Sequence, residues 1–408
     1  MKTLFVTQSI FPLSGGRPLA SYGYVSEFQK YCDLTLASPV RGDEKTEKAT
    51  IDFCRQHGIK AILVPVTSHN AYLDIVSEVP SRIKAKLTMT VPLYQKLYRE
   101  ICAFIKDNRV ELVIIDHIGM AQYFRRIQKK FPNVEFVYNS HNVEFQNTEA
   151  ELLAKAGNNP IKRLHASLRC KMRKNLERYM IANSKNVFCI SRNDMDTLAK
   201  EFGFKEKFVF SKPLIEFPRT KNIDDVREYH HKLLIVGSMN WYPNVKGIVW
   251  FVKNVFTKLK EKDPNLKLYL VGSKPTSEIQ NLASDSVIVT GFVDSTDPYF
   301  KECDISIIPV FEGTGAKIKV LESIARGIPT VCADFAAKDY DFSDNALLKA
   351  TSAEEFEEAI ERLSRSADIR EELYTKMKEY YAEYFHLSNE VVNVISKAQN
   401  QKEKTNED

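Results

Sequence analysis

The chain has 408 residues, 44% of them hydrophobic, a length that exceeds one core and predicts two domains in an ordinary globular protein. Its formal net charge is only +5, and its seven cysteines are scattered without a CxxC pair, which indicates buried, reduced thiols. The first residues, MKTLFVTQSIF, lead directly into a strand-like run, so we expect a cytoplasmic protein with neither a signal peptide nor a transmembrane helix.

Positive charge is concentrated in the first half of the chain. Residues 1–210 hold 32 Lys and Arg against 21 Asp and Glu, whereas residues 211–408 hold 26 against 32. In the segment IKRLHASLRCKMRKNLERYM, Leu164, Leu168 and Met172 share one helical face. This basic helix either lies against an anionic membrane surface or packs its apolar stripe on its own domain, and the charge pattern leaves both open. Its basic residues are Lys162, Arg163, Arg169, Lys171, Arg173, Lys174 and Arg178.

No nucleic-acid partner is expected. No DNA- or RNA-binding motif is present, and aromatic residues do not alternate with the basic ones. The sequence leaves the oligomeric state open.

Apolar runs alternate with helical patterns along the chain, twice over. Such runs are typical of parallel strands that are covered on both faces, so we predict an α/β fold with two doubly wound, Rossmann-like domains. In chain order the expected strands are Thr3–Thr7, Leu34–Ala37, Ala61–Val66, Leu112–Asp116, Glu135–Tyr138, Val187–Ile190, Leu233–Val236, Leu268–Val271, Val287–Thr290, Ile305–Ile308 and Thr330–Cys332.

The expected domain boundaries follow from these elements. Residues 1–215 form the first domain, the polar stretch 216–231 is a linker, and residues 232–380 form the second domain. A helix over 381–400 is expected to pack back on the first domain, and the polar residues 401–408 to be disordered.

The segment IIPVFEGTGAKIKVLESIARGIPTVCA has the pattern of a ligand-binding crossover. A strand is followed by a loop with Gly313 and Gly315 and then by a short helix, whose N-terminus directs free N–H groups at an anion. Lys317 and Lys319 fall in the first turn, where the helix dipole favours acidic residues, so a bound phosphate would explain them. The alternative is an ordinary turn followed by two solvated lysines.

The same helix offers a carboxylate. Val320, Leu321 and Ile324 form a buried stripe at helical spacing, which leaves Glu322 on a flank facing the same cleft. Glu322 could grip ribose hydroxyls, or it could be a plain surface residue.

Strand ends in the first half carry further candidates. Thr7 leads into SIFPLSGGRPLASYG, where Gly15 and Gly16 form either a structural turn or a substrate loop. The strand that precedes NSHNVEF places His141 and Glu144 at the corresponding sheet edge. A GxGxxG fingerprint is absent, which argues against a nicotinamide-dependent dehydrogenase.

Taken in order, these pieces resemble a known family. The second half looks like the donor-binding domain of retaining GT-B glycosyltransferases of family 4, through LLIVGSMNWYPNVKGIVWF, LYLVGS, VIVTGFV, YFKECDISIIPV and GTGAKIKVLESIARGIPTV. The first half is similar to the acceptor domain, through SGG, SHNVE and LERYMIANSKNVFCISRND. The resemblance implies two Rossmann-like domains facing a central cleft.

The resemblance also implies roles for individual residues. Glu322 matches the second glutamate of the family's EX7E motif, which holds the nucleotide ribose, and His141 matches the histidine that contacts the donor sugar. No cofactor or metal is implied, because helix N-termini and basic side chains can offset the charge of a leaving diphosphate. The donor-binding candidates are Gly15, Gly16, Gly237, Ser238, Asn240, Gly291, Phe292, Val293, Glu312, Gly313, Thr314, Gly315, Ala316, Lys317, Lys319, Val320 and Glu322.

The sequence departs from the family pattern at two places. Thr314 stands where the first motif glutamate is expected, and the nearest carboxylate is Glu312. The Arg and Lys that commonly clamp the diphosphate are replaced by the run from Gly237 to Asn240. We therefore expect Lys317 or Lys319 to replace this clamp.

These observations predict a retaining glycosyltransferase. It would move a sugar from a nucleotide-sugar donor to a glycan or lipid-linked acceptor in the synthesis of capsule, lipopolysaccharide or another surface polysaccharide, at the inner membrane face. Lys317 and Lys319 would stabilise the leaving group, His141 would orient the sugar, and Glu144 is a candidate contact for the acceptor hydroxyl. The alternatives are a non-catalytic GT-B-like partner subunit and a sugar-nucleotide epimerase on the same fold.

Overall fold

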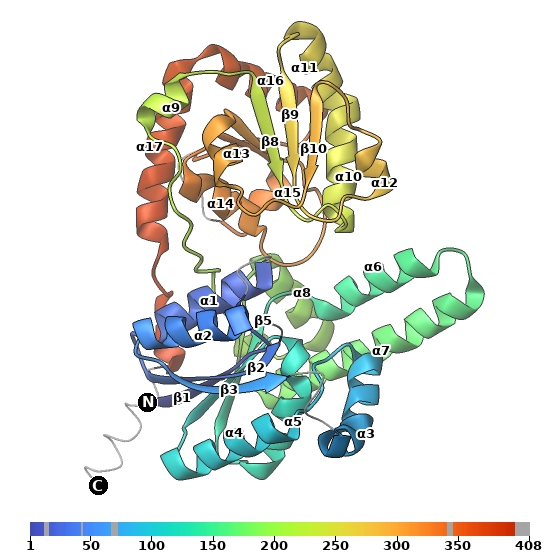
Figure 1. The fold of residues 1–408 in the computed structure, drawn as a ribbon, viewed down its shortest axis with the longest axis vertical. Coiled ribbons are helices and arrows are strands. Elements are labelled where there is room, and N and C mark those ends of the chain that lie inside the picture. The colour runs from blue at the N-terminus through green and yellow to red at the C-terminus, as the bar shows by residue number, and fades with distance from the viewer. Residues whose placement is uncertain (12–15, 42–43, 67–71, 341–345, 396–408) are drawn as a thin grey trace. The chain divides into compact units, whose positions relative to one another are not determined.

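The computed structural model describes residues 1–11, 16–41, 44–66, 72–340 and 346–395, which fold into two compact units (Figure 1). Among the described residues, the first unit comprises those within 1–215 together with 386–395, and the second comprises those within 216–385. Each unit has one sheet in which every strand pairing is parallel, with helices on both faces. The predicted α/β, doubly wound class is confirmed.

The first unit contains a seven-stranded sheet with the order β3-β2-β1-β4-β5-β6-β7. Its strands are β1 (Lys2–Val6), β2 (Asp33–Arg41), β3 (Lys60–Val66), β4 (Leu112–Asp116), β5 (Glu135–Ser140), β6 (Asn186–Cys189) and β7 (Phe208–Phe210). Its helices are α1 (Gly16–Phe28), α2 (Glu44–Gln56), α3 (Tyr72–Thr88), α4 (Gln95–Asn108), α5 (Ala121–Lys130), α6 (Glu144–Ala156), α7 (Pro160–Asn183) and α8 (Arg192–Phe202), with short 3-10 turns η1 (Ile118–Met120) and η2 (Lys205–Lys207).

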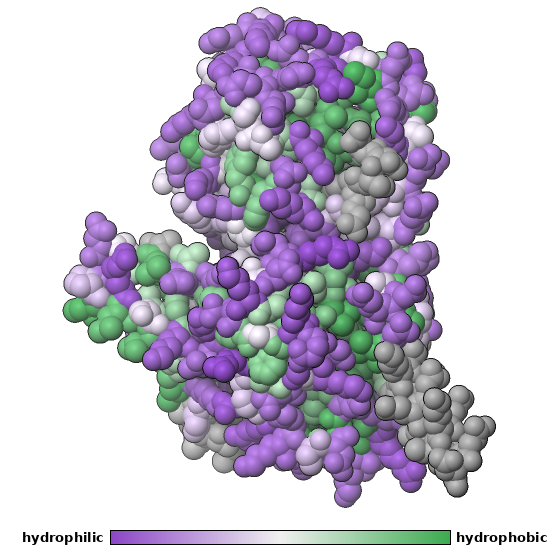
Figure 2. Space-filling view, turned by 180° about the vertical axis from the view of Figure 1, so that it is seen from behind, coloured by the Kyte–Doolittle hydropathy of each residue, from purple (hydrophilic) through white to green (hydrophobic). Residues whose placement is uncertain are grey.

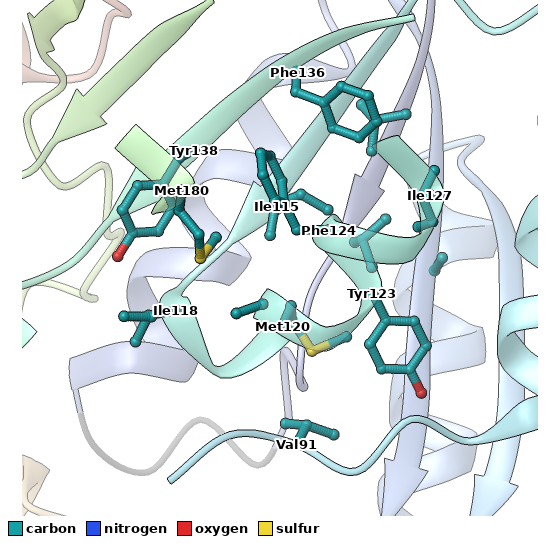
Figure 3. Packing of buried hydrophobic residues seen from close by; sticks show 14 of the residues in the cluster. Val91, Ile115, Ile118, Met120, Tyr123, Phe124, Ile127, Phe136, Tyr138 and Met180 are labelled. Carbon is teal, nitrogen blue, oxygen red and sulfur yellow. The ribbon is translucent and has the colours of Figure 1, made fainter. Parts of the chain in front are cut away.

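The apolar runs of these strands are buried on both sides. All five residues of β4 are buried, and successive side chains point to opposite faces of the sheet. Ile115 belongs to the cluster beneath α4, α5 and α7, in which it lies with Phe124, Phe136 and Met180 (Figure 3). On the other face, Phe5 of β1 packs against Phe28 of α1 with ring centroids 6.2 Å apart. Burial on both faces explains why these strands are continuously apolar rather than alternating.

The second unit contains a six-stranded sheet with the order β10-β9-β8-β11-β12-β13. Its strands are β8 (Lys232–Val236), β9 (Lys267–Val271), β10 (Val287–Gly291), β11 (Ile305–Ile308), β12 (Thr330–Ala333) and β13 (Leu348–Ala350). Its helices are α9 (Ile223–Arg227), α10 (Tyr242–Phe251), the π-helical segment η3 (Val252–Phe256), α11 (Thr257–Lys262), α12 (Ser277–Gln280), α13 (Asp297–Glu302), α14 (Ile318–Arg326), α15 (Asp334–Ala337), α16 (Ala353–Arg365) and α17 (Ala367–Tyr384).

A glycine sets the distance between the α10 helix and the strand β11. A Cβ built on Gly247 would lie 1.7 Å from the carbonyl oxygen of Pro309, which no side chain can tolerate. Helix α10 therefore packs directly on the backbone that follows β11. This contact fixes the start of the loop that carries Gly313 and Gly315.

Residues 216–231, expected as a linker, are part of the second unit. Arg370 of α17 donates from Nε to the carbonyl oxygen of Val226 at 2.6 Å and from Nη1 to that of Leu363 at 2.5 Å. The chain returns to the first unit at residue 386, where Ser388 donates a hydrogen bond to the carbonyl oxygen of Phe210 at 3.4 Å. The last part of the expected C-terminal helix and the expected disordered tail, residues 396–408, lie outside the described residues.

Candidate functional site

Loops at the ends of the strands β8, β10 and β11 carry glycines with positive φ in the second unit. Gly237 follows β8 with φ +154°, and Gly291 ends β10 with φ +70°. Gly313 and Gly315, in the loop after β11, have φ +111° and +74°. Residues with a Cβ rarely adopt these conformations, so the sequence has glycine where the backbone must turn tightly. These loops lie at the carboxyl ends of parallel strands, where ligands of this fold class bind.

Lys319 extends from the first turn of α14 toward the loop that follows β8. Its Nζ lies 3.0 Å from the point that a Cβ of Gly237 would occupy, and it hydrogen-bonds Asn244 Oδ1. Burial, together with the positive charge of Lys317, lowers the pKa of Lys319 to about 7, and the charge of Glu322 opposes this shift only partly. A cation that is only partly protonated at neutral pH gains a proton when an anion binds beside it.

Lys317 has a different environment, although it is only two residues away. It is the N-cap residue of α14, and its Nζ lies 3.3 Å from the carbonyl oxygens of Gly313 and Thr314 and 2.5 Å from that of Gly315. The side chain is buried and also lies over the ring of Phe335. Lys317 therefore holds the glycine loop in its conformation. Lys319 is the better placed of the two candidates for a phosphate clamp.

Glu322 lies one turn beyond Lys319 and is largely buried. Its Oε1 accepts a hydrogen bond from Arg326 Nε at 3.2 Å, and Arg326 is also paired with Asp297. Burial raises the pKa of Glu322 above its usual value, and the positive charges of Arg326 and Lys319 offset only part of this rise. Arg326 thus holds Glu322 in a fixed orientation, as recognition of a hydroxyl pair requires.

The other candidates of the second unit differ in how exposed their side chains are. Phe292, directly after β10, is 72% exposed, and Val293 packs on a small apolar cluster of this unit. Glu312 forms an ion pair with Lys246 at 3.1 Å, on the exposed side of the loop. The side chain of Val320 is fully buried and offers no surface to a ligand.

The remaining candidates lie on loops and helix ends. Ser238 Oγ donates to Asn240 Oδ1 at 2.8 Å, within the turn after β8. Ala316 is partly exposed, next to the N-cap of α14. Gly16 is the first residue of α1, whereas Gly15 lies outside the described residues.

In the first unit, His141 is bound to a buried carboxylate. Asp116, at the end of β4, accepts from His141 Nε2 at 2.7 Å, from Asn139 Nδ2 at 2.8 Å, from Thr7 Oγ1 at 2.7 Å and from Ser21 Oγ at 2.6 Å. Burial alone would raise the pKa of Asp116, but the charge and hydrogen bond of His141 and the two hydroxyl donors hold it well below its usual range. The ionised carboxylate can only accept, so the proton of a neutral His141 ring is on Nε2.

This arrangement leaves the other nitrogen of the ring available. His141 Nδ1 is buried, and within the described part of the chain it has no hydrogen-bond partner. Buried polar atoms are normally satisfied, so an unpaired ring nitrogen at a strand end is a candidate contact for a ligand.

Glu144 is the first residue of α6, and protein groups already occupy both of its carboxylate oxygens. Oε1 accepts from His117 Nε2 at 2.7 Å and from Asn142 Nδ2 at 3.2 Å, and Oε2 accepts from Arg173 Nη2 at 2.9 Å. His117 has φ +68°, unusual for a residue with a side chain, and this conformation directs its ring at Glu144. The expected contact of Glu144 with an acceptor hydroxyl has no support from this geometry.

Glu177, on α7, caps the helix that begins at Glu144. Its two oxygens accept the backbone N–H groups of Glu144 and Phe145, each at 3.0 Å. Burial, together with the charge of Glu144, raises the pKa of Glu177 to about 8, and the two N–H donors and Arg173 limit this rise. The N-terminus of α6 is therefore held by the Glu177 carboxyl group of the same unit.

Most of this network was not predicted from the sequence. Asp116 and His117 directly follow a buried strand in the run LVIIDH, so the strand-end rule that selected His141 would also have selected them. Arg173 was counted among the charges of a basic helix face, but it is only 3% exposed and is paired with Glu144. Its position four residues before Glu177 places the two side chains on one face of α7, but spacing alone does not distinguish a buried pair from an exposed one.

Comparisons with known proteins agree with this architecture. Residues 230–366 match the family model described as glycosyl transferases group 1, which confirms the resemblance for the second unit. No curated protein matches the chain by sequence.

Solved structures extend the likeness to the whole chain. Anabaena HepE in complex with UDP and glucose is 12% identical with a TM-score of 0.61, and the match covers 99% of this chain and 100% of HepE. WaaG, a glycosyltransferase involved in lipopolysaccharide biosynthesis, is 17% identical with a TM-score of 0.60, covering 97% and 99%. TarM is 10% identical with a TM-score of 0.64, covering 98% of both chains. At these identities the likeness shows the fold, which is GT-B with two Rossmann-like domains.

Proposed function

We propose that this protein is a retaining glycosyltransferase that takes a hexose from a nucleotide-sugar donor, because residues 230–366 match the family model of glycosyl transferases group 1. The observation that carries the proposal is the position of Lys319. Its ammonium group lies between the glycine-bearing loop after β8 and the helix that follows the Gly313–Gly315 loop. This place suits the diphosphate of the donor, and HepE was crystallised with UDP and glucose.

The chemistry requires stabilisation of the leaving diphosphate, which carries the negative charge that develops during transfer. Lys319 and the backbone N–H groups of the glycine loop would supply this stabilisation, and Lys317 would act by holding that loop. Glu322 would bind the ribose. His141 would orient the donor sugar through Nδ1, its unpaired ring nitrogen. Under this proposal no metal or cofactor takes part.

The proposed acceptor is a glycan or a lipid-linked glycan intermediate, used in the synthesis of a surface polysaccharide such as capsule or lipopolysaccharide. The basic first half of the chain supports an acceptor presented at the inner face of a membrane. In the described part of the chain, no helix combines the length and the apolar character that crossing a bilayer needs.

The test begins with thermal stabilisation by UDP, GDP, CMP and ADP and by their common sugar conjugates, with and without EDTA. Stabilisation by one nucleoside diphosphate that EDTA leaves unchanged would support the donor site and identify its base. Proton NMR of the glycosylated product then gives the anomeric configuration. An inverted product, or donor binding that depends on a divalent cation, would contradict the corresponding part of the proposal.

A second candidate is a non-catalytic partner subunit of the same fold. Two observations favour it: Thr314 stands where the resemblance expects a glutamate, and both oxygens of Glu144 are occupied by protein groups. Such a subunit would bind nucleotide without consuming the donor. A third candidate, an epimerase, would convert the donor sugar without any acceptor, so analysis of the donor after incubation alone identifies it. Consumption of the donor in the presence of candidate acceptors then separates the glycosyltransferase from the partner subunit.

A further inference from the structure

The first half of α7 exposes a stripe of large aliphatic side chains. The spacing of three and four residues puts them on one face of the helix. Hydrophobic residues gather on the projecting α6–α7 hairpin in the space-filling view (Figure 2). The exposed fractions are 78% for Ile161, 64% for Leu164, 55% for Leu168 and 39% for Met172. The stripe therefore does not pack on its own domain, which was one of the two alternatives that the sequence left open.

The end of α3 lies against the same helix. Arg169 of α7 donates from Nη2 to the carbonyl oxygen of Lys86 at 3.0 Å and from Nε to that of Leu87 at 3.4 Å. Ile83 and Leu87, one helical turn apart on α3, are 57% and 42% exposed. We call residues 80–88 and 160–174 together the α3–α7 surface.

The charge of the α3–α7 surface has one sign. Its two segments, PSRIKAKLT and PIKRLHASLRCKMRK, contain nine Lys and Arg and no Asp or Glu. Arg173 and Lys174 pair with Glu144 and Glu201, elsewhere in the unit. The exposed basic side chains are Arg82, Lys84, Lys86, Lys162, Arg163 and Lys171.

The positive charge is only partly compensated by neighbouring elements. Among the described residues, Lys162, Arg163 and Lys171 form no ion pair. Partial desolvation lowers the pKa of Lys84, and the charges of two further cations on α5, Arg125 and Arg126, lower it further. The surface therefore combines uncompensated positive charge with exposed aliphatic side chains.

These two properties select one kind of partner. A second copy of the same face would bring two positive surfaces together, which is unfavourable. A nucleic acid would use the charge but not the aliphatic stripe, and the two segments contain no Phe, Tyr or Trp on which bases could stack. An anionic bilayer uses both, since lipid phosphates pair with Lys and Arg while aliphatic side chains enter the boundary between headgroups and acyl chains.

We infer that the α3–α7 surface docks the protein onto an anionic membrane. The axis of α7 would lie in the plane of the interface, with the aliphatic stripe inserted and Lys162 and Lys171 at the level of the phosphates. The purpose of this docking, access to a lipid-linked acceptor, rests on the proposed function. The docking itself requires neither donor nor acceptor, so vesicle binding and sugar transfer can fail separately.

The experiment is flotation of the full-length protein with vesicles of phosphatidylcholine alone or with about 30% phosphatidylglycerol, at low and high salt. One variant combines Leu164→Ser with Leu168→Ser, and a second combines Lys162→Glu with Lys171→Glu. The matched control for the first variant combines Ile51→Ser with Ile223→Ser, because these side chains are 39% and 40% exposed and lie outside the α3–α7 surface. The matched control for the second combines Lys106→Glu on α4 with Lys200→Glu on α8, where both lysines are exposed. All substituted side chains are exposed, and circular dichroism and melting temperature check that the variants fold.

Wild type and both controls are expected to float with the anionic vesicles, to release at high salt, and to bind neutral vesicles at least tenfold more weakly. Each α7 variant should lose at least tenfold in binding to the anionic vesicles. The inference is overturned if wild type stays unbound, or if the α7 variants bind like the controls. It is equally overturned if the protein forms a dimer that Leu164→Ser with Leu168→Ser abolishes while vesicle binding is unchanged.

Discussion

Replacement of Lys319 by alanine tests the donor site most directly. The structure predicts that Lys319→Ala weakens the binding of the nucleoside diphosphate but does not impair folding. The ammonium group is half-buried beside Gly237, and the only hydrogen bond it makes among the described residues is to the neutral side chain of Asn244. It therefore contributes little to the stability of the free protein, and burial of its charge opposes folding.

The expected loss of affinity can be worked from this geometry. A hydrogen bond between an ammonium group and a phosphate contributes about 2 kcal/mol net, which is about 30-fold in Kd. Lys246, on α10, is exposed and pairs with Glu312, which precedes Gly313 in the loop after β11. Lys246→Ala should change Kd less than about twofold, because surface ion pairs contribute little. Lys246→Ala is therefore the matched control.

The pKa of Lys319 adds a second, independent readout. In the free protein this pKa is about 7, so at pH 8 only about a tenth of the molecules carry the charge. A bound diphosphate raises the pKa, so binding at pH 8 takes up close to one proton, and affinity falls by up to about tenfold per unit above pH 7. The terminal phosphate of the ligand, with a pKa of about 6, is already ionised at pH 8 and contributes almost nothing.

Isothermal titration calorimetry of UDP, or of whichever nucleotide stabilises the protein, measures both quantities. Titrations at pH 8 in buffers of different ionisation enthalpy give the number of protons taken up. Wild type and Lys246→Ala should take up nearly one proton, and Lys319→Ala almost none. Equal proton uptake in wild type and Lys319→Ala, or equal Kd, would refute the assignment of Lys319 as the phosphate clamp.

Three further substitutions test other parts of the structure. Asp116→Asn should lower kcat at least tenfold and alter its pH profile, with a smaller change in donor KM, because Asp116 fixes the ring of His141. The folded-state pKa of Glu177, about 8, lies above its ordinary value of 4.5, so its stabilising contribution is complete below pH 4.5 and is lost as the pH rises through 8. Urea unfolding of Glu177→Gln should therefore show a pH dependence that is weaker by on the order of 1–3 kcal/mol between pH 5 and 8.5. Gly247→Ala should destabilise the second unit by about 3 kcal/mol in the same assay, since its Cβ would overlap the carbonyl oxygen of Pro309. Unchanged kcat, parallel pH curves or an unchanged unfolding midpoint would contradict these expectations in turn.

The sequence predicted the sheets well because their strands are buried on both faces. Runs such as LLIV in β8 and LVII in β4 are continuously apolar, and helices cover both sides of them. The two strands that were missed, Phe208–Phe210 and Leu348–Ala350, are three residues long and lie at sheet edges. Such short edge segments carry no periodic signal.

The long helix of the second unit was predicted too short. The sequence pattern predicts a helix over Ile248–Leu259, whereas the structure has a continuous helical stretch from Tyr242 to Lys262, with a π-helical segment in the middle. The extra residue of the π-turn shifts the apolar face, so a strict 3.6-residue period matches only part of the stretch.

The loop with Gly313 and Gly315 was predicted from its glycines, but the sequence could not separate the two lysines beside it. Lys317 and Lys319 are two residues apart, and helical spacing alone places both near the first turn. Their difference comes from tertiary contacts, because the loop folds its carbonyl groups around Lys317 while Lys319 extends toward the residues after β8. Similarly, no local pattern connects Glu144 to His117, because 27 residues separate them.

The two units hold their key polar groups with opposite kinds of partner, and the difference follows from the chemistry proposed for each. His141 would contact the sugar through Nδ1, so an ionised carboxylate, Asp116, can fix its ring through Nε2 without occupying the nitrogen that the site needs. Lys319 must present a positive charge to a phosphate, and a carboxylate in contact with it would neutralise that charge in advance. The amide oxygen of Asn244 orients the ammonium group and leaves its charge in place. The resulting burial of a poorly compensated cation lowers its pKa toward neutrality, so the same feature that keeps the site ready for an anion also makes anion binding sensitive to pH.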